Sequence, residues 1–209
     1  MSALRDLAGL DLPPATLDRL EALEALTRRW TARINLVAPS TVPDLWTRHI
    51  LDSAQLWPLA PANPTTWADL GYGGGFPGLV IAALGADTGT PHVTLIESDG
   101  RKCAFLRTAA RELSLPATVL DQRAESARPQ AAPVVSARAL APLPVLLRYA
   151  HALLAPGGVA LFPKGRTAER ELTNASRDWI MRVERFPSRT DPASTVFRIS
   201  EIRPAGSEA

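Results

Sequence analysis

The stretch Asp69-Leu70-Gly71-Tyr72-Gly73-Gly74-Gly75-Phe76-Pro77-Gly78 places a glycine-rich loop between a predicted strand over residues 65–70 and a predicted helix over residues 76–84. Glycines let the backbone turn tightly and approach a ligand, because no Cβ atom stands in the way. The helix that follows offers free amide N–H groups in its first turn. A strand, a glycine loop and a helix in this order are typical of an open α/β sheet, which binds ligands at the carboxyl ends of its strands.

Alternating strand and helix signals continue from this loop to the end of the chain. Strands are predicted over residues 92–97, 117–121, 134–136 and 159–162, and helices over residues 101–113, 142–154 and 167–179. A turn is predicted over residues 156–158, and residues 183–186 and 195–202 are typical of a closing antiparallel pair. Strands that alternate with helices of about 10–15 residues indicate a parallel sheet covered on both faces. The predicted fold class is therefore α/β, a doubly wound, mostly parallel sheet of seven strands.

Helical signals dominate the first 64 residues, which we predict to form a cap (residues 1–64) on one compact sheet domain (residues 65–209). Large apolar residues recur there every three or four positions, and this spacing predicts one face of a helix. They are Leu17, Leu20, Leu23, Leu26 and Trp30. Pro13 and Pro14 suit the start of that helix, because their missing amide protons are not needed there. A second helix is predicted from about Pro43 to about Trp57.

The composition suits a globular chain with a sizeable core, since 46% of the residues are hydrophobic. No apolar run approaches the roughly 20 residues that cross a bilayer. The N-terminus lacks the layout of a signal peptide, and one cysteine, Cys103, excludes an internal disulfide. We therefore expect a cytoplasmic protein that has no membrane partner and is a monomer.

The basic residues are almost all arginine. Of the 23 lysines and arginines only Lys102 and Lys164 are lysine, and the net charge is +2. Arginine suits phosphates and stacked bases, because its planar fork bonds bidentately and lies flat on rings. Codon usage is the simpler explanation, since alanine and proline are also abundant. The charge therefore permits a nucleic-acid partner without requiring one.

Two classes of cofactor use loops of this kind, and Asp69 helps to separate them. The G-x-G-x-x-G spacing that starts at Gly73 matches a dinucleotide fingerprint, but that match alone is weak. A carboxylate beside a pyrophosphate is unfavourable, whereas Asp69 before Gly71 suits the ammonium and sulfonium of S-adenosylmethionine. Glu97 ends the next strand and can accept ribose hydroxyls in either class. We predict S-adenosylmethionine rather than NAD, and we expect Gly73→Val to fill the cofactor's space while the fold survives. A glycine connector without a ligand is the remaining alternative.

Further stretches, from about Leu20 to about Arg203, resemble a known family. They are Ile34-Asn35-Leu36, Arg48-His49-Ile50-Leu51-Asp52-Ser53, the loop over residues 69–78, Lys102-Cys103-Ala104-Phe105-Leu106, Arg123-Ala124-Glu125, Ser136-Ala137-Arg138-Ala139 and Lys164-Gly165. In these the chain resembles the bacterial small-subunit rRNA guanine-N7 methyltransferase family, also called glucose-inhibited division protein B. The Arg-His-x-x-Asp-Ser stretch upstream of Gly-Phe-Pro-Gly is specific to that family, which the glycine loop alone is not.

The resemblance implies methyl transfer from S-adenosylmethionine to N7 of a guanine, guanine 527, in 16S rRNA of the small ribosomal subunit. It places the cofactor against Gly71, Phe76, the backbone of Ala124-Glu125, and Arg138. Tyr72 stands where the family more often has a small residue, and its ring either crowds the methionine end or points to solvent.

Arg48, His49 and Asp52 lie on the predicted second helix, where His49 and Asp52 share a face because they are three residues apart. Helical spacing alone favours a packed histidine, whereas the resemblance favours an RNA contact by Arg48 and His49, or an orienting pair. Basic residues along the chain give a wider predicted RNA footprint. They are Arg28, Arg29, Arg33, Arg48 and Lys164.

Three further basic residues follow predicted strands, where ligand contacts are expected. Arg138 is a candidate for positioning cofactor or base, with a surface ion pair as the alternative. Arg123 is a candidate for contact with RNA or with the cofactor carboxylate, with a solvated loop charge as the alternative. Lys164 is a candidate for a phosphate contact.

The chemistry needs neither a nucleophile nor a metal. Cys103 lies inside a predicted helix and is expected to serve packing, and His92 and His151 have no partners at metal-ligand spacing. The run of Asn or Asp, two prolines and an aromatic, common in enzymes that methylate exocyclic amines, is replaced here by Ser136-Ala137-Arg138-Ala139. Guanine N7 carries a free lone pair, so transfer requires alignment rather than a general base. No residue is therefore predicted to act as an acid or base.

Three functions stay open on the residues alone. The first is an rRNA guanine-N7 methyltransferase. The second is a methyltransferase of another RNA, of a small molecule or of a protein, because fold does not fix substrate. The third is a module that binds S-adenosylmethionine and RNA without turnover.

Overall fold

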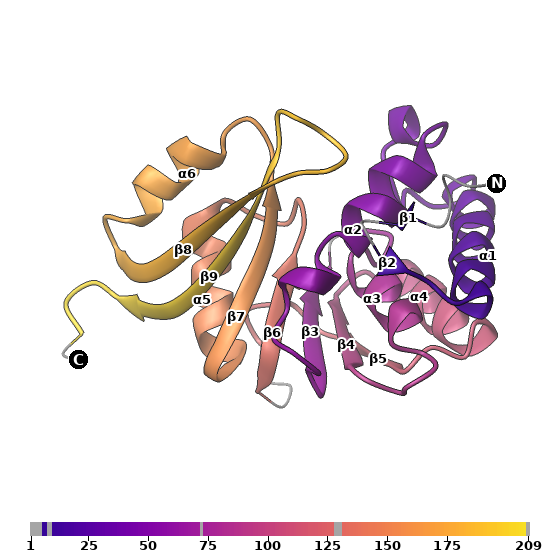
Figure 1. The fold of residues 1–209 in the computed structure, drawn as a ribbon, viewed down its shortest axis with the longest axis horizontal. Helices are drawn as coiled ribbons and strands as arrows, with labels where there is room; N and C mark the ends of the chain where they lie inside the picture. The colour runs from indigo at the N-terminus through magenta and orange to yellow at the C-terminus, as the bar shows by residue number, and fades with distance from the viewer. Residues whose placement is uncertain (1–5, 8–9, 72, 128–130, 208–209) are drawn as a thin grey trace.

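The computed structural model describes residues 6–7, 10–71, 73–127 and 131–207, and its main sheet has the seven strands that the sequence predicts (Figure 1). The strand order is β5-β4-β3-β6-β7-β9-β8. Neighbouring strands from β5 to β7 are parallel, and β9 pairs antiparallel with both β7 and β8. The strands are β3 (Thr66–Leu70), β4 (His92–Glu97), β5 (Ala117–Asp121), β6 (Ala132–Ala137), β7 (Leu154–Lys164), β8 (Trp179–Pro187) and β9 (Thr195–Pro204).

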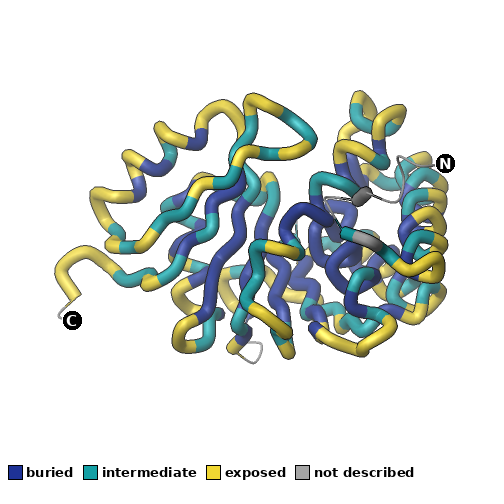
Figure 2. Tube along the Cα trace, viewed as in Figure 1, coloured by how far each residue is buried: buried dark blue, intermediate teal, exposed yellow. Residues whose placement is uncertain are grey.

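Helices cover both faces of the sheet. Successive residues of each strand point to opposite sides, so the apolar residues of the strands contribute to two hydrophobic clusters, one on each face. In β3, Trp67 belongs to the hydrophobic cluster that includes residues of α1, α3 and α4, whereas Ala68 belongs to the cluster of α5 and α6. The central strands are accordingly buried along their length (Figure 2). The helices are α1 (Pro14–Thr31), α3 (Gly78–Leu84), α4 (Gly100–Glu112), α5 (Leu143–Leu153) and α6 (Ala168–Ala175).

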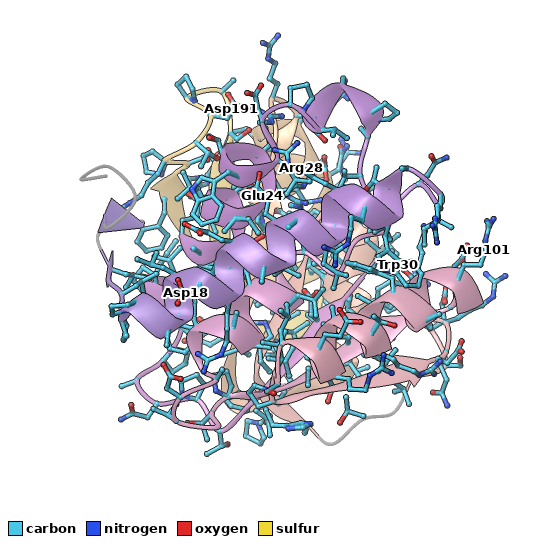
Figure 3. The ribbon with its side chains drawn as sticks, turned by 90° about the vertical axis from the view of Figure 1, so that its right-hand side faces the viewer. Asp18, Glu24, Arg28, Trp30, Arg101 and Asp191 are labelled. Carbon is cyan, nitrogen blue, oxygen red and sulfur yellow. The ribbon has the colours of Figure 1, made fainter. Side chains whose placement is uncertain are left out.

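The N-terminal segment shares a core with the sheet. Leu20, Leu23 and Leu26 of α1 are buried in the same cluster as Phe105 and Leu106 of α4. The rings of Trp30 and Phe105 lie 5.6 Å apart, and Figure 3 shows α1 in front of this side of the molecule. The predicted first helix is therefore confirmed, and its apolar face packs on α3 and α4.

Four predictions about local structure are wrong. The pair β1 (Asp6–Leu7) and β2 (Leu10–Asp11) interrupts the segment predicted as helical, and these strands are too short to show alternation. The second helical segment is shorter than predicted, with a π-helical part (Trp46–Leu51) that leads into α2 (Asp52–Ala54). Residues 156–158 lie within β7.

The fourth concerns the helix predicted over residues 167–179, which ends at Ala175. Trp179 instead begins β8, where it pairs with Pro204 and its ring lies 5.8 Å from that of His151. These tertiary contacts override the helical pattern of the local sequence. None of the helices in the described part of the chain has the length and apolar character that a bilayer crossing needs.

Candidate functional site

The candidate site lies where the carboxyl ends of four parallel strands meet. From β3 the chain continues to β4 on one side, and β6 pairs with β3 on the other, so the strand order reverses at β3. Ligands of open α/β sheets bind at such a reversal. Gly71, Glu97, Ala124 and Arg138 follow or end the strands β3, β4, β5 and β6, so the fold brings these predicted cofactor residues to one edge.

Asp69 supports the glycine loop from below. Its side chain is fully buried, and its two oxygens accept hydrogen bonds from the Gly78 amide (3.0 Å) and the Ser136 hydroxyl (2.5 Å). Ser136 in turn accepts a bond from Trp67 Nε1 at 2.8 Å. Burial raises the pKa of Asp69 to about 6, although the hydrogen bonds from Ser136 and Gly78 oppose the rise. The carboxylate therefore joins β3, β6 and the start of α3, and its electrostatic role toward the cofactor stays a prediction.

Glu97 ties the loop to the next strand. It is 3% exposed; its Oε1 accepts from the amides of Ser98 (2.7 Å) and Asp99 (2.8 Å), and its Oε2 accepts from the Gly73 amide at 3.2 Å. A carboxylate offers about four lone-pair positions. Glu97 thus has capacity left for hydroxyl donors at the carboxyl end of β4.

The two glycines predicted to contact the cofactor differ in what surrounds them. A Cβ on Gly73 meets the Leu36 carbonyl oxygen at 2.7 Å, and Gly73 has φ of +127°. The expectation that Gly73→Val spares the fold is therefore wrong, since the side chain collides with backbone rather than with cofactor. A Cβ on Gly71 meets nothing closer than the Ile96 carbonyl oxygen at 3.4 Å, and Glu97 Oε2 lies at 3.9 Å. The open side of the loop is at Gly71.

The predicted residues after β5 form a turn beside the glycine loop's edge of the sheet. The carbonyl oxygen of Arg123 accepts from the amides of Ser126 (3.1 Å) and Ala127 (3.0 Å), while the Arg123 side chain is exposed. Glu125 Oε1 accepts from the Tyr149 hydroxyl at 3.0 Å. The prediction for Tyr72 concerns a residue outside the described ranges.

A cavity of about 590 Å³ lies next to this edge, and we call it the target cavity. It brings together candidates for RNA contact and positioning that lie far apart in the sequence, although the positioning candidate Arg123 does not line it. They are Arg48, His49, Phe76, Arg138 and Lys164. Its remaining walls include Asp52, Pro163, Glu171, Thr190 and Asp191.

His49 is a neutral, fixed side chain in the wall of this cavity. It is 7% exposed, with Arg138 Nη2 2.5 Å from its Nδ1 and Thr41 Oγ1 2.8 Å from its Nε2. Because a guanidinium only donates, Nδ1 is the acceptor, and Nε2–H donates to Thr41. Burial and the charges of Arg138 and Arg48 lower the pKa of His49 to about 3. The histidine therefore holds Arg138 and does not titrate near neutral pH.

Arg138 is the centre of the polar network. Besides His49, its Nη1 donates to Asp52 Oδ2 (3.1 Å) and to the Arg48 carbonyl oxygen (2.9 Å). The guanidinium lies 5.6 Å from the centre of the Phe76 ring, within the range of a cation–π contact. His49 and Asp52 thus share a helical face, as predicted, and both point to Arg138. This arrangement can orient groups in the cavity, and none of its parts is poised as a base.

The loop between the antiparallel strands β8 and β9 reaches over to the segment of α2, a contact that the sequence did not predict (Figure 1). Thr190 Oγ1 donates to Asp52 Oδ1 at 2.7 Å, and the Arg189 amide donates to Gln55 Oε1 at 2.9 Å. Asp191 Oδ2 lies 3.8 Å from Arg48 Nη1. These partners are more than 130 positions apart, so no local spacing could have indicated them.

Two residues of the predicted RNA footprint are already engaged. Lys164 Nζ donates to Glu171 Oε2 (2.9 Å) and to the Ala141 carbonyl oxygen (3.0 Å), and its side chain is 10% exposed. Arg28 binds Glu24 at 2.6 Å and the Val42 carbonyl oxygen at 2.5 Å. Both therefore join segments of the fold, and neither is a free phosphate contact in this structure.

Cys103 is buried, and its thiol donates to the Glu97 carbonyl oxygen at 3.3 Å. Burial raises the pKa of this thiol to about 11, which agrees with the predicted packing role. His92 bonds Thr118 (2.8 Å), and His151 bonds the Ile202 carbonyl oxygen (2.9 Å). Within the described ranges no three His, Cys, Asp or Glu side chains gather as a metal site would require.

Comparison with known proteins gives concordant matches. The profile of the GidB family, described as rRNA small subunit methyltransferase G, matches residues 16–193. The chain is 58% identical over 199 residues to the ribosomal RNA small subunit methyltransferase G of Rhodospirillum centenum, covering 95% of this chain and 90% of the relative. It is also 58% identical over 188 residues to the protein of the same name from Acidiphilium cryptum, covering 89% and 85%.

Solved structures share the fold at low sequence identity. A ribosomal protein L11 methylase from Lactobacillus delbrueckii subsp. bulgaricus superposes with a TM-score of 0.58 at 17% identity, over 73% of this chain and 78% of that one. The 16S rRNA methylase RmtB superposes with a TM-score of 0.54 at 16% identity, over 95% and 79%. The sheet is therefore that of class I S-adenosylmethionine-dependent methyltransferases.

Proposed function

The chain belongs to the rRNA small subunit methyltransferase G family, and we propose that it methylates N7 of a guanine, guanine 527, in 16S rRNA of the small ribosomal subunit. It is an S-adenosylmethionine-dependent rRNA methyltransferase. Relatives at 58% identity over most of the chain favour this function over transfer to a small molecule or a protein, and over a module without turnover.

The edge formed by Gly71 and Glu97 fits S-adenosylmethionine. Gly71 leaves room on its open side, and the buried Glu97 carboxylate can accept ribose hydroxyls beside it. We assign the cofactor to these two residues, with Phe76, the Ala124-Glu125 backbone and Arg138 around it. Asp69 and Gly73 act from beneath by fixing the loop. When bound, the cofactor supplies an electrophilic methyl group on a sulfonium.

The target cavity supplies alignment. In an A-form helix the major groove is too deep and narrow for side chains to reach N7, so the guanine must leave the stack to react. The cavity adjoins the glycine loop through Gly74 and Phe76, and it is where we place the base. Arg138, held by His49 and Asp52, positions base or cofactor, and exposed Arg123 is a second positioning candidate. Arg48, His49 and Lys164 line the cavity; Arg48 and His49 are the proposed RNA-facing residues, while Lys164 is held by Glu171 and the Ala141 carbonyl oxygen.

One observation carries the mechanism: His49 Nδ1 accepts a hydrogen bond from Arg138 and is therefore occupied. N7 attacks through its lone pair and needs no proton removed, so the neutral histidine and the fixed arginine suffice as positioning groups. Neither a base nor a metal is part of the proposal. Transfer of radiolabelled methyl from S-adenosylmethionine to isolated small subunits, but not to large subunits or free nucleosides, tests the function.

The cap and the sheet domain act together in this proposal, because they share one hydrophobic cluster and both line the target cavity. We further propose that the protein works as a monomer on ribosomal subunits in the cytoplasm.

A further inference from the structure

A second cavity, of about 610 Å³, adjoins the target cavity, and we call it the α1–α4 cleft. Residues 36–38 line both cavities, so the two are neighbours across this segment. The other walls of the cleft include Arg33 and Asn35, which follow α1, Gly73 of the glycine loop, and Asp99, Arg101 and Lys102 at the start of α4. No predicted cofactor residue other than Gly73 lines it.

The two cavities differ in charge. Among the described residues, three cationic side chains and three carboxylates line the target cavity, so its charges cancel. The cations are Arg48, Arg138 and Lys164, and the carboxylates are Asp52, Glu171 and Asp191. The described walls of the α1–α4 cleft carry three cations and the single carboxylate of Asp99. An anion therefore meets excess positive charge in the cleft and none in the target cavity.

The arginines of the cleft are also accessible. Within the described ranges Arg33 is exposed, and its side chain makes no hydrogen bond or ion pair; its backbone amide donates to the Trp30 carbonyl oxygen at 2.8 Å. Arg101 projects from the start of α4 (Figure 3), its side chain is 76% exposed, and its ion pair with Asp99 is long at 3.8 Å. Arg28 and Lys164, by contrast, are held by partners in the fold. Arg33 is thus a member of the predicted footprint that stays available for RNA, and Arg101 adds a second exposed cation in the cleft.

We propose that the α1–α4 cleft binds a backbone phosphate of the rRNA strand that flanks the target guanine. A guanidinium matches a phosphate bidentately, and phosphate contacts set the register of a protein on nucleic acid. The cleft borders the target cavity, so a strand whose base enters that cavity carries its neighbouring phosphates past residues 36–38. This proposal rests on the proposed function, since it takes rRNA as the substrate.

The test uses the full chain and small subunits from a strain that lacks the enzyme. The variant is Arg33→Gln/Arg101→Gln, and the control is Arg148→Gln/Arg177→Gln, which removes two exposed arginines from the side of α5 and α6. Subunit binding is measured by filter retention from about 50 to 200 mM salt, together with calorimetric binding of S-adenosylmethionine.

We expect the cleft variant to bind subunits about tenfold more weakly and to lower the salt slope by about one to two units, with unchanged cofactor affinity. The control should match the wild type in all three. Equal slopes and affinities for the cleft variant and the wild type overturn the cleft proposal and leave methyl transfer untouched. If the wild type transfers no methyl group to the subunits, but the cleft variant still has a lower salt slope than the wild type, the proposed function is contradicted and the cleft proposal is supported.

Discussion

Arg138 Nη2 lies 2.5 Å from Nδ1 of His49, and this contact fixes both the tautomer and the charge of the histidine. A base must offer an unoccupied lone pair, and the remaining ring nitrogen faces the hydroxyl of Thr41. Protonation of His49 puts a second positive charge beside the guanidinium. The pair is therefore a rigid positioning element in the wall of the target cavity.

We predict that His49→Gln weakens subunit binding without creating or removing a pH dependence. Glutamine can keep one hydrogen bond to Arg138 but not the ring contact with Phe76, whose centre lies 5.2 Å from that of His49. Single-turnover methyl transfer with saturating subunits is measured from about pH 6 to pH 9. A wild-type rate that climbs tenfold per pH unit through this range, and a flat rate in the variant, shows that His49 is a base. His151→Gln, outside the site, is the matched control.

Stability should also report the state of His49. Its pKa falls from 6.5 to about 3 on folding, so below pH 6.5 the unfolded chain binds the extra proton and stability is lost as the pH falls. The loss is at most about 1.4 kcal/mol per pH unit. Asp69 has the opposite effect on stability. Its pKa rises from 3.8 to about 6 on folding, so the folded chain binds the extra proton and stability increases as the pH falls from 6.

His49→Gln removes the first effect and keeps the second. The difference in unfolding free energy between wild type and variant should therefore shrink in urea titrations between pH 6.5 and pH 4.5, and stay constant between pH 7 and pH 8. A difference independent of pH throughout means that the histidine titrates alike in both states.

Substitutions in the glycine loop can separate an effect on stability from an effect on cofactor binding. Gly73→Ala should lower stability by about 1–3 kcal/mol, because its Cβ meets the Leu36 carbonyl oxygen and its φ is positive. Gly71→Ala should leave the melting temperature near that of the wild type and weaken S-adenosylmethionine in calorimetry. Gly100→Ala, whose Cβ meets nothing within 4 Å, is the control for stability. Equal cofactor affinity in Gly71→Ala and wild type removes Gly71 from the binding site.

The β8–β9 loop should matter for the substrate through Thr190. Thr190→Val deletes the hydrogen bond to Asp52 Oδ1, which costs about 1 kcal/mol and leaves Gln55 as the remaining donor to that oxygen of the carboxylate that holds Arg138. We expect the KM for subunits to rise about fivefold, the factor that corresponds to that energy. Thr173→Val removes a hydroxyl that bonds the Glu169 carbonyl oxygen within α6 and serves as the control. Unchanged KM in both variants excludes the loop from substrate binding.

Local patterns were sufficient for the parallel strands but not for the polar network. The strands at residues 92–97 and 117–121 lie where the sequence predicts them, because short apolar runs with clear boundaries indicate strands. The Arg-His-x-x-Asp stretch indicated that His49 and Asp52 share a face. That Arg138 joins them, and that Thr190 closes the network from the far end of the chain, depends on tertiary packing alone.

The sequence also could not indicate which basic side chains are already paired within the fold. Lys164 and Arg28 are basic residues of the types that bind phosphate, but the side chain of each is held by a carboxylate and a backbone carbonyl. Arg101, which the footprint omitted, is exposed beside the glycine loop. Which cations stay available depends on the neighbours that folding supplies.

The central claim is that this chain methylates N7 of guanine 527 in small-subunit rRNA. It is tested by mapping N7-methylguanine, through chemical cleavage at the modified base and primer extension, in 16S rRNA from a strain without the enzyme. The strain is complemented with the wild-type chain or with Arg138→Ala, which removes the arginine held by His49 and Asp52. We predict one cleavage, at guanine 527, with the wild type, and its loss with Arg138→Ala. No cleavage with the wild type, or cleavage at another guanine, contradicts the account.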